Sequence, residues 1–335
     1  MATRNQKLKI LYIVDILKRY SDEEHPLSAA FIISKLQEFG INAERKAIYN
    51  DIECLIEYGY DIIKTRQPNA GYFLANRDFE LPEIYLLEDA VRTAHFITTK
   101  KTRDLCRKID GFLSVHQLRR RGNRTYINTD GKTKNEAIFY NIDTISRAIE
   151  NRHKLSFKYG VRELGANREI ITVYKERIIN PYALTWQDDH YYLIGNYDKY
   201  DNLVHLRVDR MKSVEETEIK YRHFGEVSSY SDSFDVADYT QSLFDMFSGD
   251  LTPVHLKCAK KTLEQIVDRF GDAVFVTNVT DTHFEIEVNC ALSDALCTWL
   301  IGYGDDIEIK SPQLLKDKML GRIEKIQNLY SQKNT

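Results

Sequence analysis

The amino-acid sequence predicts an α+β protein with several domains. Near the start, three segments with apolar residues at helical spacing precede two short apolar runs around a polar turn, which is the order of a winged helix-turn-helix. Further on, one helix leads into several short strand-like segments, which favour a small antiparallel β-barrel. Toward the end, strand-like and helix-like segments alternate, which indicates an α+β sandwich. The length of 335 residues fits roughly two to three domains.

The first predicted domain, a winged helix-turn-helix over residues 1–78, follows from helix start and stop signals. Apolar residues recur at helical spacing over residues 7–20. Ser28 is the expected N-cap of the second helix, and Asn42 is the expected N-cap of the third. Four aliphatic residues are expected on the buried face of the third helix: Ile48, Ile52, Leu55 and Ile56.

The start of the third helix carries the candidate DNA contacts on its outward face. Four residues share that face: Arg45, Lys46, Tyr49 and Asn50. A recognition helix needs long donors near its N-terminus because that end enters the major groove. Arg and Lys reach guanine or phosphate, and Asn binds adenine through two hydrogen bonds. Arg66, in the polar turn between the two short strands that follow this helix, is a candidate wing contact to the DNA backbone or minor groove. The alternative is an amphipathic helix with an ordinary solvated face.

A helical connector with a basic linker is predicted over residues 79–135. Residues 80–116 have a mostly helical pattern, and residues 119–124 are expected to form an exposed loop. Residues 100–124 hold nine Lys and Arg against two Asp. Such blocks are usually solvated faces or linkers, although beside a DNA-binding domain this one could contact phosphates or steer association.

Residues 180–211 predict a β-hairpin with one cationic face. Two apolar-rich runs, residues 191–195 and 203–208, flank a polar turn. Successive strand residues point to opposite faces, so His205 and Arg207 share one face while Leu206 and Val208 share the other. The apolar face can close a core, and the cationic face suits an anion.

This hairpin resembles that of the WYL-domain transcriptional regulators. The resemblance rests on Pro181, the triplet Tyr191-Tyr192-Leu193 and the run of residues 207–211, with Tyr191 standing where Trp is usual. Residues 47–55 are also similar to the recognition helix of such regulators, which commonly have Arg where this chain has Asn50. The resemblance implies three further parts: an Sm-like WYL barrel over residues 136–225, a linker over residues 226–250 and a WYL C-terminal extension over residues 251–335.

The resemblance also implies a site for an anionic effector, a nucleotide or single-stranded nucleic acid, on the basic face of the barrel. Five residues match this face: Tyr159, His190, His205, Arg207 and Arg210. Arginine offers forked donors to phosphate, and Tyr and His can stack on a base. The alternative is structural, with Arg210 paired to Asp209 or to another carboxylate.

Composition and missing motifs narrow the function classes. The five cysteines are scattered without a Cys-x-x-Cys pair, which predicts buried thiols in a reducing compartment. No apolar signal core or bilayer-spanning run is present, which predicts a cytoplasmic protein. Asp188-Asp189-His190 is the nearest approach to a metal site, but its position favours a hairpin tip. No hydrolase or phosphate-loop motif occurs, so neither an enzyme nor a cofactor is expected.

These observations favour a ligand-responsive transcription regulator that binds double-stranded DNA. A single winged helix touches few bases, so a homodimer on an inverted repeat is expected. A second hypothesis makes the barrel the main site of a single-stranded nucleic-acid-binding accessory protein. A third, a hydrolase, predicts turnover with added metal.

Overall fold

The chain forms two compact units, which are described separately. The computed structural model describes residues 2–66, 68–121, 131–227, 236–246 and 251–331. Contacts divide the chain into unit 1, Met1–Glu136, and unit 2, Ala137–Thr335. No helix of the described residues is long and apolar enough to cross a membrane.

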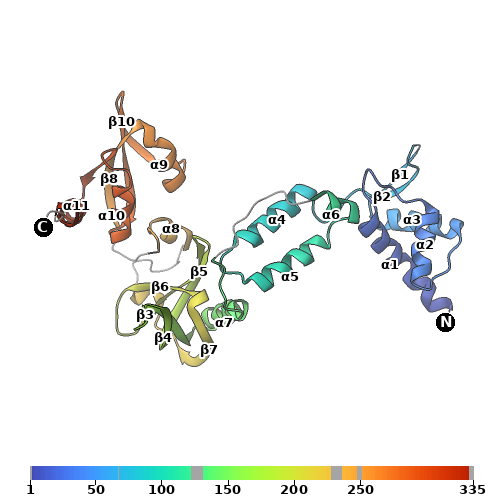
Figure 1. Cartoon of the computed structure of the whole chain (residues 1–335), viewed down its shortest axis with the longest axis horizontal. Helices are drawn as coiled ribbons and strands as arrows, with labels where there is room; N and C mark the ends of the chain where they lie inside the picture. Colours follow the sequence, from blue (N-terminus) through green and yellow to red (C-terminus); the bar gives the residue numbers. More distant parts are fainter. Residues whose placement is uncertain (1, 67, 122–130, 228–235, 247–250, 332–335) are drawn as a thin grey trace. The chain divides into compact units, whose positions relative to one another are not determined.

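Unit 1 begins with three helices and a hairpin, in the order that the sequence predicts (Figure 1). These elements are α1 (Ala2–Tyr20), α2 (Ala29–Glu38), α3 (Arg45–Tyr58), β1 (Ile62–Thr65) and β2 (Gly71–Leu74). The Ser28 hydroxyl caps α2 by accepting the Phe31 amide at 3.2 Å, as expected for an N-cap. α3 ends at Gly59, whose φ of 116° favours glycine. Aliphatic stripes on the three helices close one core around Ile13, Ile32 and Ile48.

Two details of α3 differ from the expectation. The helix starts later than Asn42 predicts: Glu44 is the N-cap residue, and its side chain makes no cap hydrogen bond. Ile48, Ile52 and Leu55 are buried, but Ile56 is 46% exposed because the next residue after Leu55 is rotated about 100° out of the apolar stripe. Cys54 is likewise exposed, against the expectation of a buried thiol.

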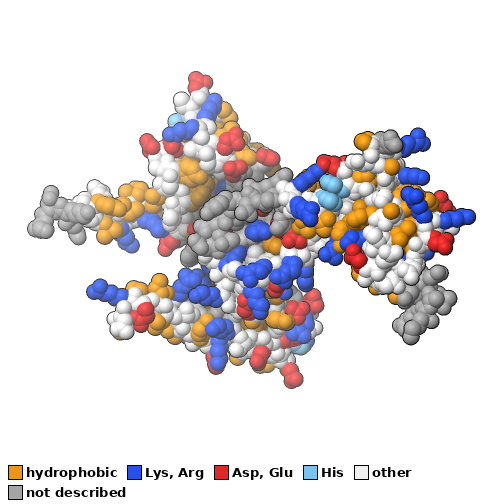
Figure 2. Space-filling view, turned by 45° about the vertical axis from the view of Figure 1, so that its right-hand side comes forward, with side chains coloured by type: hydrophobic (Ala, Val, Ile, Leu, Met, Phe, Trp, Pro, Cys, Tyr) orange, Lys and Arg blue, Asp and Glu red, His pale blue; other side chains and the backbone are white. Residues whose placement is uncertain are grey.

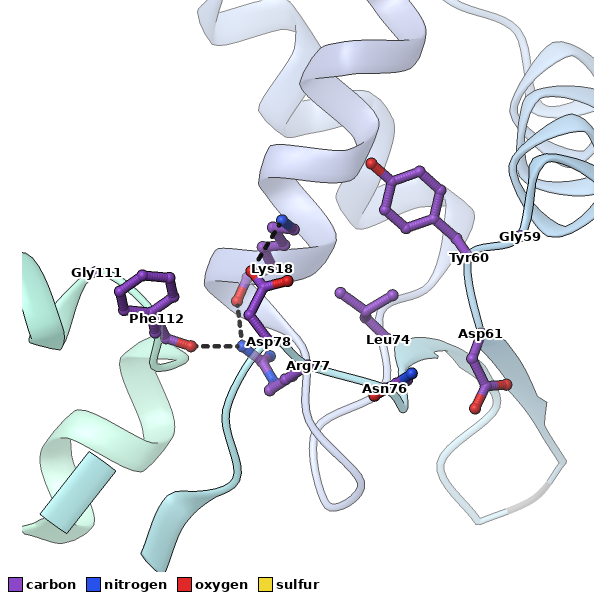
Figure 3. A pocket seen from close by; sticks show the side chains of 10 residues that line it. All are labelled: Lys18, Gly59, Tyr60, Asp61, Leu74, Asn76, Arg77, Asp78, Gly111 and Phe112. Carbon is purple, nitrogen blue, oxygen red and sulfur yellow. Dashed lines mark hydrogen bonds and ion pairs between the residues drawn. The ribbon is translucent and has the colours of Figure 1, made fainter. Parts of the chain in front are cut away.

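The connector consists of three short helices: α4 (Leu81–Thr93), α5 (Thr99–Asp110) and α6 (Val115–Arg121). Arg119 to Arg121 therefore belong to a helix rather than to the expected loop, and residues 122–130 lie outside the described residues. Arg77 joins this connector to the preceding elements. Its guanidinium donates to the carbonyls of Lys18 at 2.9 Å and Phe112 at 3.2 Å (Figure 3). It also donates to the Ser21 carbonyl at 2.5 Å.

Unit 2 begins with one helix and a five-stranded antiparallel sheet. The elements are α7 (Ile138–Asn151), β3 (His153–Leu164), β4 (Ile170–Gln187), β5 (His190–Asn196), β6 (Leu203–Arg207), the 3₁₀ turn η1 (Val208–Arg210) and β7 (Met211–Lys220). The strand order is β6-β5-β4-β3-β7. β4 is central: its first half pairs with β3, and its second half pairs with β5. α7 packs on the sheet, where Asn141 donates to the Met211 carbonyl at 3.0 Å.

The predicted closed barrel does not form in this sheet. β6 and β7 lie at opposite ends of the strand order and do not pair in the part of the chain that the structure describes. However, only the three residues of η1 separate them, so the sheet must curl until its two edges approach each other. We call this region the seam. It consists of the end of β6 at Arg207, the turn η1 and Tyr159, which lies at the end of the β3–β7 pairing. The strand prediction for residues 203–208 also ran one residue too far, because β6 ends at Arg207.

The C-terminal part of unit 2 alternates strands and helices as predicted. Its elements are β8 (Leu251–Ala259), η3 (Lys260–Thr262), α9 (Leu263–Phe270), β9 (Phe275–Val279), β10 (His283–Ala291), α10 (Asp294–Ile301), β11 (Ile307–Ser311) and α11 (Gln313–Ser331). The antiparallel order is β11-β8-β10-β9, and Val254, Leu256 and Ile286 lie in its core. The sequence did not predict β9, because all five residues of this edge strand are exposed and show no inward face.

The segment predicted as a linker between these two sheets is partly structured. It contains the short turn η2 (Phe224–Glu226) and α8 (Val236–Gln241). Tyr239, Leu243 and Met246 are buried in one cluster with Tyr182 and Ile194 of the first sheet. The described part of this segment therefore covers the sheet that carries β5 and β6.

Candidate functional site

The first candidate site lies on the opening turn of α3. Arg45, Lys46 and Asn50 are exposed, and Tyr49 is half-buried. Because Glu44 makes no side-chain cap, the first backbone amides of the helix are left for solvent or a ligand. The 2.8 Å ion pair between Lys9 and Asp51 fixes α3 against α1 from its other side. The cationic turn therefore lies on a helix that an ion pair joins to α1.

A lysine that the sequence did not single out extends this surface. The Lys64 ammonium of β1 lies 5.9 Å from the Tyr49 ring centre and 5.7 Å from that of Tyr72. Both distances fall within the range of cation–π attraction. Arg66 is exposed directly after β1. Alternation in β1 could have indicated Lys64, since its neighbours Ile63 and Thr65 point to the other face.

The cationic surface at α3 is local. Figure 2 shows Lys and Arg side chains mixed with Asp and Glu over the visible face, in agreement with the net charge of −3. Glu53 and Glu57 are exposed further along α3, so its positive charge is confined to the first turn. Such a turn can offer charged and amide donors to phosphates and to base edges.

The second candidate site lies at the seam in unit 2. Tyr159 comes from β3, and its hydroxyl accepts the backbone amide of Arg207 at 3.2 Å. The positive charge of Arg210 also acts on this hydroxyl and partly offsets the rise in the pKa of Tyr159 that burial causes. A tyrosine thus joins β3 to the end of β6, where no strand pairing does so in the described sheet.

Arg207 and Asp209 form a bidentate ion pair at this seam. The guanidinium donates to the two carboxylate oxygens at 3.0 and 2.9 Å, and the side chains are only 23% and 12% exposed. Burial alone would lower the pKa of Arg207, but the hydrogen bond and charge of Asp209 outweigh it and raise that pKa. Burial alone would raise the pKa of Asp209, but Arg207 outweighs it and lowers that pKa. The charge of Arg207 is therefore largely neutralised within the protein.

Arg210 differs from Arg207 because it is exposed. Its guanidinium carries five N–H donors. Burial raises the pKa of Tyr159, so its hydroxyl stays protonated at neutral pH. The alternative of an Arg210–Asp209 pair is thus replaced by an Arg207–Asp209 pair, with Arg210 as the accessible cation.

The two histidines of the predicted set occupy different surroundings. His190 is half-buried, its ring centre lies 6.4 Å from that of Tyr192, and its charge, when present, acts on Asp209. His205 is covered by the α8 segment, and its Nε2 lies 3.0 Å from the Tyr239 hydroxyl. Burial lowers the pKa of His205 to about 4, so the ring is neutral at physiological pH. The seam therefore gathers Tyr159, Arg207, Arg210 and His190, whereas the half-buried His205 lies against Tyr239 of α8.

Comparison with known proteins identifies the two sheets of unit 2. Residues 140–216 match the family model of the WYL domain, and residues 250–327 match that of the WCX domain. The chain carries a WYL domain followed by a WCX domain. This result confirms the resemblance that the sequence shows at the level of these domains.

Comparisons of the whole chain give only a weak similarity. No curated protein matches the chain. Among solved structures, it is similar to proteasome accessory factor B/C (PafBC) of Arthrobacter aurescens, at 15% identity and a TM-score of 0.26. The similarity covers 97% of this chain and 46% of that one, so this chain spans about half the length of its structural neighbour.

The WYL domain also contains the acidic tip that came nearest to a metal motif. Asp188 and Asp189 both have positive φ, 48° and 58°, and form the two-residue turn that joins β4 to β5. Among the described residues, no group of three or more His, Cys, Asp or Glu is arranged to hold a metal ion.

A cavity of about 450 Å³ opens in unit 1 beside Arg77, outside the WYL and WCX domains (Figure 3). Tyr60, Leu74 and Phe112 supply its apolar wall. Lys18 lies 3.6 Å from Asp78, and the Arg77 guanidinium is satisfied by backbone carbonyls. Because these charges are engaged with the protein, the cavity shows no set of polar groups aimed at one ligand class.

Proposed function

We propose that the protein is a transcription regulator that binds double-stranded DNA through the opening turn of α3 and senses an anionic effector at the WYL seam. The observation that carries the proposal is the exposed cationic start of α3, in a three-helix unit with a hairpin, in the same chain as a WYL domain. The proposal includes a cytoplasmic, non-enzymatic protein that acts as a homodimer on an inverted repeat.

The DNA-binding part of the proposal assigns separate roles to the residues of unit 1. Arg45 and Lys46 contact phosphate or guanine, and Asn50 contacts adenine. Lys64 and Arg66, on and beside β1, contact the backbone next to the base-reading helix. The order of three helices followed by a hairpin supports a winged helix-turn-helix, in which the third helix enters the major groove.

The effector part of the proposal assigns ligand binding to Arg210 and Tyr159. Arg210 is the accessible cation of the seam, and the Tyr159 hydroxyl is bound to the neighbouring Arg207 amide. Nucleotides and single-stranded nucleic acids share the phosphate that a guanidinium binds in a forked geometry. Arg207 supports this site by keeping Asp209 neutralised, because a free carboxylate beside Arg210 would repel the ligand.

Footprinting and salt-dependent binding on the DNA upstream of its own gene test the first part. Arg45→Ala with Lys46→Ala should abolish the protected site and reduce the slope of log K against log salt by about 1.8, if both residues contact phosphates. The matched control is Lys260→Ala with Lys325→Ala, two exposed lysines in unit 2 that change the net charge equally. Equal loss of binding in both double variants would contradict a specific role for α3.

Binding of single-stranded oligonucleotides tests the second part and the alternative function. Arg210→Ala should weaken binding of the oligonucleotide about tenfold or more and leave duplex binding without effector unchanged. If the protein binds only single strands and Arg45→Ala with Lys46→Ala changes nothing, the chain is a single-stranded nucleic-acid-binding accessory protein instead.

A further inference from the structure

The outer face of α5 in unit 1 carries exposed cations with few partners in the protein. Lys100 and Arg103 are exposed and have no ion-pair partner among the described residues. Arg107 is 72% exposed and lies 3.4 Å from Asp104, whose side chain is 43% exposed. An ion pair at such an exposed position contributes little to stability, so a stronger anion can replace it. These three cations are therefore available to a partner.

The three cations form one stripe along the helix. At about 100° per residue, Lys100, Arg103 and Arg107 fall within about 60° of one another around the axis. The buried residues of α5, Thr102 and Cys106, lie on a different side of the helix. The stripe spans about 10 Å, since an α-helix rises about 1.5 Å per residue. We call these three residues the α5 stripe.

The charges of α5 work against the stability of the helix itself. Its first turn holds Lys100 and Lys101 and no acidic residue, although the positive end of the helix dipole favours carboxylates there. Arg103 lies about one turn from both Lys100 and Arg107, and like charges at these spacings destabilise a helix. Well-behaved solvated surfaces intersperse both signs of charge instead. Natural sequences break such local rules mainly at functional sites, which indicates that this surface binds an anion.

We propose that the α5 stripe is a second duplex-binding surface, which contacts the phosphate backbone of DNA outside the bases that α3 reads. The inference rests on the proposed function, because α3 brings the duplex to unit 1. One DNA strand carries a phosphate about every 3.4 Å of helix axis, so a stripe of about 10 Å matches about three phosphates. Contacts to phosphates carry no sequence information, so the stripe adds affinity without specificity. Bound phosphates also relieve the repulsion between its cations.

Salt-dependent binding to two duplexes tests the α5 stripe in the full chain. One duplex contains the site protected in footprinting, and the other has the same length and an unrelated sequence. Lys100→Ala with Arg103→Ala should weaken binding to both duplexes about tenfold or more and reduce the slope of log K against log salt by about 1.8. The matched control, Lys260→Ala with Lys325→Ala, removes two exposed lysines of unit 2 and should leave both slopes unchanged.

Charge reversal at Lys100 separates a binding role from a structural one. Lys100→Glu places a carboxylate in the first turn and removes the repulsion with Arg103, so the backbone amides of α5 should exchange hydrogen more slowly in the free protein. The same variant should weaken binding to both duplexes, because it removes a cation from the stripe and adds an anion. Lys325→Glu in α11 reverses an equal charge and is the matched control. Slower exchange with unchanged duplex binding would show a merely solvated face and would overturn the proposal.

The outcomes distinguish this inference from the proposed function. Equal loss of affinity for both duplexes, with the protected site restored at higher protein concentration, supports the α5 stripe. Unchanged affinity and slope would overturn the stripe as a DNA contact, and an acidic protein would then be the partner that its charge fits. A loss confined to the duplex with the protected site would overturn a contact that ignores sequence. Failure of the unaltered protein to bind either duplex would overturn the proposed function as well.

Discussion

The ion pair between Arg207 and Asp209 allows the most direct test of the seam. Arg207→Ala would leave a carboxylate that is only 12% exposed without its bidentate partner. Hydrogen bonds to charged groups contribute about 1.5–3 kcal/mol, so this variant should destabilise the WYL domain by about that amount. Arg210→Ala removes an exposed cation and should cost at most about 1 kcal/mol.

The measurement is denaturant unfolding of the full chain followed by Trp186 fluorescence. The chain contains two tryptophans, so Trp299→Phe leaves Trp186 of β4 as the reporter of the WYL sheet. A double-mutant cycle with Arg207→Ala and Asp209→Ala isolates the pair. We expect a coupling of about 1.5–3 kcal/mol at pH 7. A coupling near zero, or equal losses in Arg207→Ala and Arg210→Ala, would refute the assignment.

The pH dependence of this coupling has a defined sign. The pKa of Asp209 is lowered from 3.8 in the folded protein. A carboxyl with a lowered pKa contributes stability above its unfolded pKa and loses it as the pH falls through its folded pKa. The coupling should therefore be equal at pH 7 and pH 5 and should decline only below 3.8. A decline between pH 7 and pH 5 would assign the interaction to a histidine instead.

Three further predictions follow from buried contacts. His205 has a pKa of about 4 in the folded protein and 6.5 in the unfolded chain, so the unfolded chain takes up a proton first as the pH falls. The free energy of unfolding should therefore fall by about 2–3 kcal/mol between pH 6.5 and 4. His205→Gln should remove this dependence in unfolding followed by Trp186 fluorescence. Gly71→Ala should destabilise unit 1 by about 1–3 kcal/mol in thermal unfolding, because the added Cβ would lie 2.7 Å from backbone atoms of Leu27. In the control Gly321→Ala in α11, the added Cβ meets nothing within 4 Å, so this variant should stabilise unit 2 by up to about 1 kcal/mol. Arg77→Ala should increase hydrogen exchange at the end of α1, because it removes donors to the Lys18 and Ser21 carbonyls, and unchanged exchange would contradict that role.

Local patterns account for most elements that the sequence predicted. The three helices of unit 1 follow from apolar spacing and from caps such as Ser28, which act within a few residues. The hairpin of β5 and β6 follows from two apolar runs around a polar turn. Elements without such a pattern were missed: β9 is exposed throughout, and α8 lies in a segment whose polar composition indicates a loop.

The candidate site residues likewise fall into two groups, those whose exposure follows from local spacing and those whose surroundings depend on distant segments. Exposure of Arg45, Lys46 and Asn50 agrees with helical periodicity, because a residue's face on a single helix is fixed by its own neighbours. The contact of His205 with the α8 segment could not be predicted in this way. Alternation placed it on the same face as Arg207, but it cannot show that the α8 segment, more than thirty residues later, covers one of these positions and not the other.

The sequence by itself determined the helix and strand types, the cationic opening turn of α3 and the presence of the WYL motif, because these depend on spacing along the chain. Only the tertiary structure decided that Asp209 neutralises Arg207, that the Tyr159 hydroxyl accepts the Arg207 amide, and that Lys64 lies over Tyr49. These contacts depend on how the sheet curls and on which elements meet at its edges. Charge pairing and burial are set by distances in space, and those distances arise only when the chain has folded.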